Sequence, residues 1–160
     1  MNHEIKLVAV DIDGTFVRSD YTYDVPRFKR ILGRMKEAGC RFVVASGNQY
    51  YQLRDLFPGY GDELAFVAEN GAFVKDGKEL VFAADMPKET VDEVIDVCRE
   101  YPEILNVLCG VNSAYCERGK VSQEFFDLTK VYYHRLQWTD DFKEVKDQIL
   151  KFAPAVPEEK

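Results

Sequence analysis

Short apolar runs alternate with helical patterns in the first half of the chain. Apolar residues dominate positions 5–10, 41–45 and 65–68, and each run has the length of a buried strand. Apolar residues also recur at helical spacing over positions 28–38, and residues 50–56 favour a second helix. Short apolar strands that alternate with helices usually pair in parallel. This half therefore predicts an α/β fold with a Rossmann-like parallel sheet core.

The pattern changes after Gly71, where only three strands of the parallel type have been formed. Sheets of this class usually carry about five or six strands, so we expect the core to be C-terminally incomplete. The further expected elements are a β-hairpin over 72–82, a helix from Pro87, strands over 106–109 and 113–116, a helix over 122–128, a strand over 131–136, and a last helix with Phe142, Val145, Ile149 and Phe152. A boundary near Ala84 divides the core (1–84) from a partial α+β module (85–160).

Composition narrows the classes of function. The 160 residues are 46% hydrophobic, which is typical of a globular protein, and carry a formal net charge of −7. Nucleic acid is an unfavourable partner for such a chain, because a phosphate backbone requires a basic surface. The sequence contains neither an apolar stretch long enough to span a membrane nor the features of a signal peptide at its start. We expect a soluble, cytoplasmic protein.

The densest chemical signal is the segment Asp11-Ile12-Asp13-Gly14-Thr15, directly after the first apolar run. Side chains at i and i+2 of an extended segment point the same way, so Asp11 and Asp13 should share one space. Two carboxylates held so close need a cation between them or a proton on one of them. A simple Asp-Gly turn is the alternative. A calcium loop is excluded by Thr22 at loop position 12 and by the preceding strand.

Two further polar clusters follow the second and third apolar runs. In open α/β sheets, ligands bind outside the carboxyl ends of the strands, which is where all three clusters fall. Ser46 offers a hydroxyl group, and Gly47 lets backbone N–H groups approach an anion, so this cluster predicts phosphate binding. Asn48 adds a neutral amide. Asn70 is equally consistent with loop geometry and with lining a substrate space.

These motifs resemble the signatures of the haloacid dehalogenase (HAD) superfamily of aspartate-nucleophile phosphatases. Asp11-Ile12-Asp13-Gly14-Thr15 is similar to its first signature and Ala45-Ser46-Gly47-Asn48 to its second, while Glu69-Asn70-Gly71-Ala72 is typical of the Cof-type branch. Longer segments, residues 42–53 and 66–72, resemble the bacterial sugar phosphatases of that branch. The resemblance implies a HAD-like core followed by part of an inserted α+β cap (class C2B).

The resemblance also implies roles for individual residues. Asp11 would be the nucleophile and bind Mg²⁺, and Asp13 would act as acid and base while its backbone carbonyl binds the metal. Thr15 would orient Asp13. Ser46, with the Gly47 and Asn48 backbone, would hold the phosphoryl oxygens of a small phosphorylated sugar. Many relatives have arginine at position 48, so asparagine removes a positive charge here.

The family also uses a third-signature lysine and a fourth-signature Gly-Asp downstream of the cap, and this chain contains neither. We therefore expect these 160 residues to be a weak or inactive Mg²⁺-dependent phosphatase. Three alternatives remain. The first is a phosphomutase of the same superfamily, and the second is a truncated phosphate-binding or dimerising module that forms a homo-oligomer through an unpaired sheet edge. The third, a phospho-acceptor receiver domain, fits poorly because receivers lack the Asp-x-Asp-Gly-Thr run.

Overall fold

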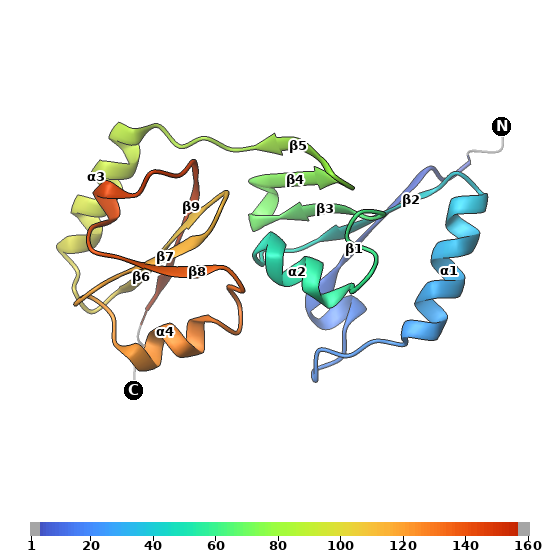
Figure 1. The fold of residues 1–160 in the computed structure, drawn as a ribbon, viewed down its shortest axis with the longest axis horizontal. Coiled ribbons are helices and arrows are strands. Elements are labelled where there is room, and N and C mark those ends of the chain that lie inside the picture. The colour runs from blue at the N-terminus through green and yellow to red at the C-terminus, as the bar shows by residue number, and fades with distance from the viewer. Residues whose placement is uncertain (1–3, 157–160) are drawn as a thin grey trace. The chain divides into compact units, whose positions relative to one another are not determined.

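A computed structural model describes residues 4–156 of the chain (Figure 1). The chain separates into two compact units, Met1–Phe82 and Ala83–Lys160. We call them the first and second unit and describe each by itself. No helix within residues 4–156 has the length and apolar character needed to cross a membrane.

The first unit is built on a five-stranded sheet of order β1-β2-β3-β4-β5 (Figure 1). Strands β1 and β3 both pair with β2 in parallel, and β4 is antiparallel to β3. The strands are β1 (Leu7–Asp11), β2 (Arg41–Ala45), β3 (Ala65–Ala68), β4 (Phe73–Asp76) and β5 (Glu79–Ala83). The expected parallel sheet and hairpin are therefore both present. The parallel pairing places the carboxyl ends of β1, β2 and β3 at one edge.

Two helices cover one face of this sheet. Helix α1 (Val25–Glu37) begins where the Asp24 side chain accepts a hydrogen bond from the Arg27 N–H at 2.8 Å. Its Phe28 ring contacts Phe42 of β2. Helix α2 (Tyr50–Leu56) places Tyr50 against Phe66 of β3. Val44 pairs with Phe66 and lies on the same face as Phe42, so both helices pack on one side.

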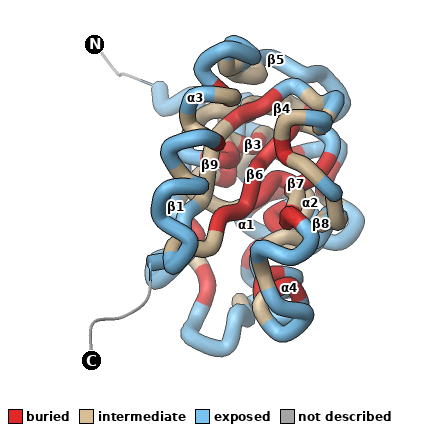
Figure 2. The backbone as a smooth tube through the Cα atoms, turned by 90° about the vertical axis from the view of Figure 1, so that its left-hand side faces the viewer, coloured by how far each residue is buried: buried red, intermediate tan, exposed pale blue. Residues whose placement is uncertain are grey.

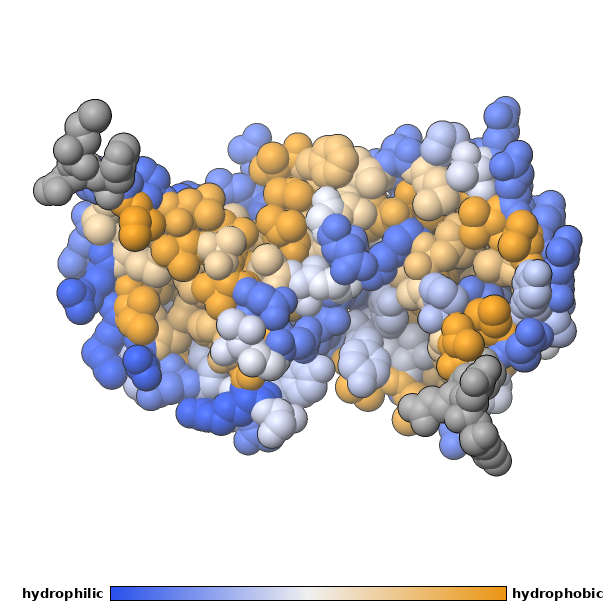
Figure 3. Space-filling model, turned by 180° about the vertical axis from the view of Figure 1, so that it is seen from behind, coloured by the Kyte–Doolittle hydropathy of each residue, from blue (hydrophilic) through white to orange (hydrophobic). Residues whose placement is uncertain are grey.

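Strand β1 is more exposed than its sequence predicts. The expectation of a buried strand is wrong: Leu7 is 55% exposed and the preceding Ile5 69%. The reason is its place at the edge of the sheet, with the face that carries Leu7 pointing away from the helices. Figure 2 draws β1 as an exposed segment, and Figure 3 shows hydrophobic residues gathered on the surface of this unit.

The second unit has a four-stranded sheet of order β8-β7-β6-β9, with one helix packed on each face. Its elements are α3 (Lys88–Arg99), β6 (Leu105–Gly110), β7 (Ala114–Glu117), α4 (Gln123–Thr129), β8 (Leu136–Thr139) and β9 (Ile149–Ala155). Adjacent residues of β6 point to opposite faces: Leu108 packs with Ile95 of α3, and Val107 packs with Phe126 of α4. The Trp138 ring stacks on Phe126 with 4.2 Å between centroids.

Two expected elements of this unit are wrong. The strand expected over 131–136 is displaced: residues 131–135 form turns, and strand β8 begins at Leu136. The expected last helix is a short 3-10 turn, Phe142–Glu144, followed by strand β9. The spacing of its apolar residues imitates a helix, but β9 pairs along almost the whole of β6. Satisfying the backbone of β6 outweighs local periodicity.

The Asp147 carboxylate organises the turn between β6 and β7. It accepts hydrogen bonds from the backbone N–H groups of Asn112, Ser113 and Gln148 and from the Asn112 amide. It also accepts one from the Tyr115 hydroxyl at 2.9 Å. A Cβ atom added to Gly110 would lie 2.3 Å from its Oδ2, which explains glycine there. A single side chain thus satisfies several donors of the turn.

We expect Asp147→Ala to lower the free energy of unfolding of the second unit by about 2 kcal/mol, because the turn donors lose a shared charged acceptor. Urea unfolding followed by the fluorescence of Trp138, the only tryptophan, measures this change. Asp140→Ala is the matched control, since the Asp140 side chain is 85% exposed. Equal effects of the two substitutions would contradict the role assigned to Asp147.

Candidate functional site

Three loops meet at the carboxyl ends of β1, β2 and β3. Asp11 is the last residue of β1 and pairs with Ala45, the last residue of β2. Ser46 follows directly, and its N–H donates to the Val67 carbonyl oxygen of β3 at 3.0 Å. The parallel register therefore brings the three polar clusters of the sequence together.

The first loop places Asp11 and Asp13 at the surface. The intervening Ile12 is fully buried, while both aspartates are exposed, as expected if they point the same way. Gly14 follows with φ of +70°, a left-handed conformation that glycine adopts without strain. The Thr15 hydroxyl donates to Asp11 Oδ2 at 3.3 Å. The contact expected between Thr15 and Asp13 is thus replaced by one to Asp11, four residues earlier.

Asp13 is bound by the second loop. Its Oδ2 atom accepts hydrogen bonds from the Ser46 hydroxyl at 3.3 Å and from the Asn48 side-chain amide at 3.0 Å. The Asn48 backbone N–H donates to Ser46 Oγ at 3.1 Å. Residues more than thirty positions apart therefore form one network, and all its donors to Asp13 are neutral.

The third loop holds the second in place. Glu69 and Asn70 both have left-handed backbones, with φ of 54° and 58°, and Gly71 follows with φ of 90°. The Glu69 N–H donates to the Asn48 carbonyl oxygen at 3.1 Å, and the Asn70 N–H to that of Ser46 at 3.4 Å. A Cβ atom on Gly47 would lie 2.5 Å from Asn70 Oδ1, so a larger residue there would require the Asn70 amide to move.

The residues that the sequence suggested for the site lie at the end of β1 or in these loops: Asp11, Asp13, Thr15, Ser46, Gly47, Asn48 and Asn70. Sequence reasoning did not select Glu69 as a site residue, although its side chain is only 2% exposed and its N–H holds Asn48. Its position directly after β3 and before Asn70-Gly71 is the sequence feature that could have identified Glu69.

The residues present suit Mg²⁺ but supply only part of its ligands. Mg²⁺ is usually bound by one or two carboxylates, with water and substrate phosphate completing six oxygen ligands. Asp11 offers a carboxylate, and exposed Asp13, two residues further on, would offer its backbone carbonyl oxygen. Within residues 4–156, no group of three or more acidic, histidine or cysteine side chains is placed to enclose a metal by itself. A bound phosphate group would have to complete the shell.

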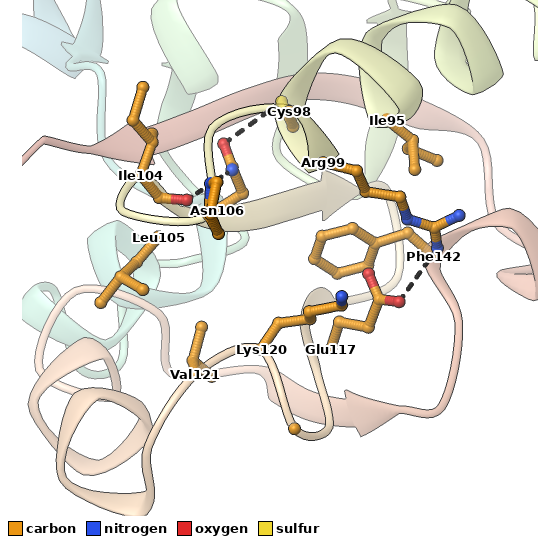
Figure 4. Close-up of a pocket in the computed structure, with 12 residues that line it drawn as sticks. Ile95, Cys98, Arg99, Ile104, Leu105, Asn106, Glu117, Lys120, Val121 and Phe142 are labelled. Carbon is orange, nitrogen blue, oxygen red and sulfur yellow. Dashed lines mark hydrogen bonds and ion pairs between the residues drawn. The ribbon is translucent and has the colours of Figure 1, made fainter.

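The second unit contains a separate cavity of about 270 Å³ beside the end of α3 (Figure 4). Ile95, Leu105 and Phe142 contribute apolar walls. Arg99 crosses one side and donates to Glu117 Oε1 at 3.0 Å and to Asp141 Oδ1 at 2.8 Å. The pKa of Asp141 lies below its usual value, first because it accepts a hydrogen bond from the Lys143 N–H and also because of Arg99. Arg99 is thus held between two carboxylates.

The buried thiols of the second unit are expected to be inert. Burial raises the pKa of Cys116 to about 12, so almost none of the reactive thiolate exists at pH 8. Cys109 is also buried, whereas Cys40 and Cys98 are partly exposed, and these four side chains are thiols outside any disulfide. We expect a disulfide reagent to modify at most Cys40 and Cys98 in the native protein and all four in urea. Mass spectrometry of the labelled peptides tests this; rapid native labelling of Cys116 would contradict the packing around it.

Comparison with solved structures supports the fold. The chain is similar to a protein from Streptococcus mutans UA159 (TM-score 0.86, 33% identity), covering 94% of this chain and 56% of that one. It is also similar to a protein from Eubacterium rectale described as a putative phosphate (TM-score 0.82, 28% identity), and that match covers 97% of this chain and 59% of the other. Both likenesses confirm the predicted α/β, HAD-like fold class.

Sequence comparison gives the same family. A curated relative from Escherichia coli K12, named 5-amino-6-(5-phospho-D-ribitylamino)uracil phosphatase YbjI, is 44% identical over 150 residues. That match covers 93% of this chain but 55% of the relative, so the chain spans about half its length. The family model described as haloacid dehalogenase-like hydrolase matches residues 8–160. The chain with paired aspartates at the end of β1 therefore belongs to the haloacid dehalogenase-like hydrolases.

Proposed function

We propose that this chain is a Mg²⁺-dependent phosphatase of small phosphorylated sugars that works through an aspartyl-phosphate. The observation that carries the proposal is the placement of Asp11 and Asp13 on one exposed loop, beside the hydroxyl and amide groups of the β2 loop. A nucleophile and a proton donor for a phosphate ester need this proximity. The name of the E. coli relative, which includes a phosphoribityl group, supports a polyol or sugar phosphate as substrate.

The reaction has two balanced steps. First, an Asp11 oxygen forms a bond to phosphorus, the bond from phosphorus to the sugar oxygen breaks, and Asp13 gives that oxygen its proton. Then Asp13 takes a proton from water as the water oxygen attacks phosphorus, and inorganic phosphate leaves with Asp11 restored. Ser46 and the backbone N–H groups of Gly47 and Asn48 would hold the phosphoryl oxygens. The Ser46 hydroxyl would then turn away from Asp13 Oδ2, and the Asn48 N–H away from Ser46 Oγ. Mg²⁺, held by Asp11 and the Asp13 carbonyl, would offset the negative charge of phosphate.

We propose that turnover is slow. Within residues 4–156, the side chains that donate hydrogen bonds to Asp11 and Asp13 include Thr15, Ser46 and Asn48, which are neutral. A lysine beside the nucleophile would stabilise the transferring phosphoryl group, and its contribution is missing from these contacts. The second unit would act as part of the cap that excludes water and selects the sugar.

Phosphate release from p-nitrophenyl phosphate and from a set of sugar phosphates, with Mg²⁺ and with EDTA, tests the proposal. Release that requires Mg²⁺ is expected. A phosphomutase would instead convert one sugar phosphate into an isomer without free phosphate. Absence of both reactions under all these conditions would show that the chain is not a catalyst.

The exposed edge of the first unit favours one non-catalytic alternative, a module that forms a homo-oligomer. Leu7 of β1 is 55% exposed on an unpaired sheet edge, a feature that invites pairing with a second copy. Light scattering over a range of concentrations, with Leu7→Asp as the disrupting variant, tests it. A monomer at all concentrations would exclude it. The free cysteines support a reducing compartment, and we propose the cytoplasm.

A further inference from the structure

Two donors converge on one oxygen atom of Asp13. The Asn48 side-chain amide lies 3.0 Å and the Ser46 hydroxyl 3.3 Å from Asp13 Oδ2. An amide NH₂ group can only donate. The Ser46 oxygen already accepts the Asn48 backbone N–H at 3.1 Å, which leaves its own hydrogen free to point at Asp13. Oδ2 is therefore an acceptor in this network.

We infer that Asn48 is a positioning residue for Asp13, an inference that rests on the proposed function. The contact to Asn48 turns Oδ2 of the Asp13 carboxyl group toward the β2 loop and leaves Oδ1 as the oxygen that faces away from it. Asn48 thereby fixes both the rotation of the carboxyl group and the oxygen that delivers the proton to the leaving group.

The strained turn after β3 supports the position of Asn48. Its Glu69 N–H holds the Asn48 carbonyl and its Asn70 N–H holds that of Ser46. Left-handed conformations at two successive residues other than glycine cost roughly 1–2 kcal/mol each and persist only where the surroundings enforce them. The two hydrogen bonds to the β2 loop provide such an enforcement. The turn keeps the β2 loop, and with it the Asn48 amide, at a fixed distance from Asp13.

The kinetic test uses two leaving groups. A sugar alkoxide needs the proton from Asp13, whereas p-nitrophenolate leaves without one. General acid catalysis contributes about 10²–10⁴-fold, so we expect Asn48→Ala to lower kcat for a sugar phosphate by roughly 10- to 100-fold. For p-nitrophenyl phosphate we expect a loss under about threefold. Equal losses for both esters would mean that Asn48 has a merely structural role and would overturn the inference.

Asn112→Ala is the matched control, because Asn112 binds an aspartate of the second unit, Asp147. It should leave both kcat values unchanged.

A second test is independent of turnover. The side-chain ¹H and ¹⁵N resonances of Asn48 should move when Asp13→Ala removes the acceptor of its amide. The Asn112 amide, bound to Asp147, should be unaffected by Asp13→Ala. Asn48 signals that ignore Asp13→Ala would overturn the inference even in an active phosphatase. A chain that shows the coupling but hydrolyses no phosphate ester would instead refute the proposed function alone.

Discussion

Asp11→Asn is expected to abolish Mg²⁺-dependent phosphate release, by at least about 10³-fold, because an amide cannot attack phosphorus to form the aspartyl-phosphate. The substitution keeps the size of the side chain and leaves an oxygen to accept the Thr15 hydroxyl, which lies 3.3 Å from Asp11 Oδ2. Folding should therefore be preserved, and circular dichroism can confirm it. Phosphate release measured with a radiolabelled substrate is sensitive enough to detect such a loss in a slow enzyme.

Asp20→Asn provides the matched control. Asp20 lies in an exposed turn, where its Oδ1 accepts hydrogen bonds from the Thr22 hydroxyl and N–H. These bonds hold the pKa of Asp20 below its usual value. The same chemical change there should leave phosphate release within about twofold of wild type. Comparable turnover by Asp11→Asn and wild type would refute the assignment of Asp11 as nucleophile.

The strand ends of the core could be predicted because their signals are local. A buried apolar run, a following polar cluster and an intervening helix are each readable in a short window, and parallel pairing then brings the clusters together. Asp11, Ser46 and Asn70 came together for this reason. The positions of their loops follow from the topology, without knowledge of individual contacts.

Contacts across long sequence separations could not be predicted in this way. Asn48 was expected to contribute backbone to phosphate binding, yet its amide contacts Asp13, 35 residues away. The local pattern predicts a helix where β9 forms, because the pairing of β9 with β6 cannot be recognised in a short window. The exposure of β1 depends on what covers a sheet edge, which is a property of the tertiary structure. In each case the deciding partner lies far along the chain.

The second large effect is expected at Phe28, the centre of the aromatic cluster that anchors the aspartate loop. Its ring, 4% exposed, lies 5.6 Å from Phe16, the residue after Thr15, and also packs against Phe42 of β2. Phe28→Ala leaves a cavity between α1, the sheet and this loop. We expect this substitution to lower the free energy of unfolding of the first unit by about 3–5 kcal/mol, which is a large part of the stability of a small domain.

Hydrogen exchange with mass spectrometry resolves the effect of Phe28→Ala by unit. Protection of β1, β2 and β3 should fall strongly while that of β6 and β9 is retained, because the two units have separate cores. Phe82→Ala, at a side chain 53% exposed, removes the same ring at the surface and should cost less than about 1 kcal/mol. Equal hydrogen exchange in Phe28→Ala and Phe82→Ala would show that the aromatic cluster does not anchor the aspartate loop. If Phe28→Ala also destabilises the Asp11–Thr15 segment, the core of the sheet and the geometry of the two aspartates depend on the same packing.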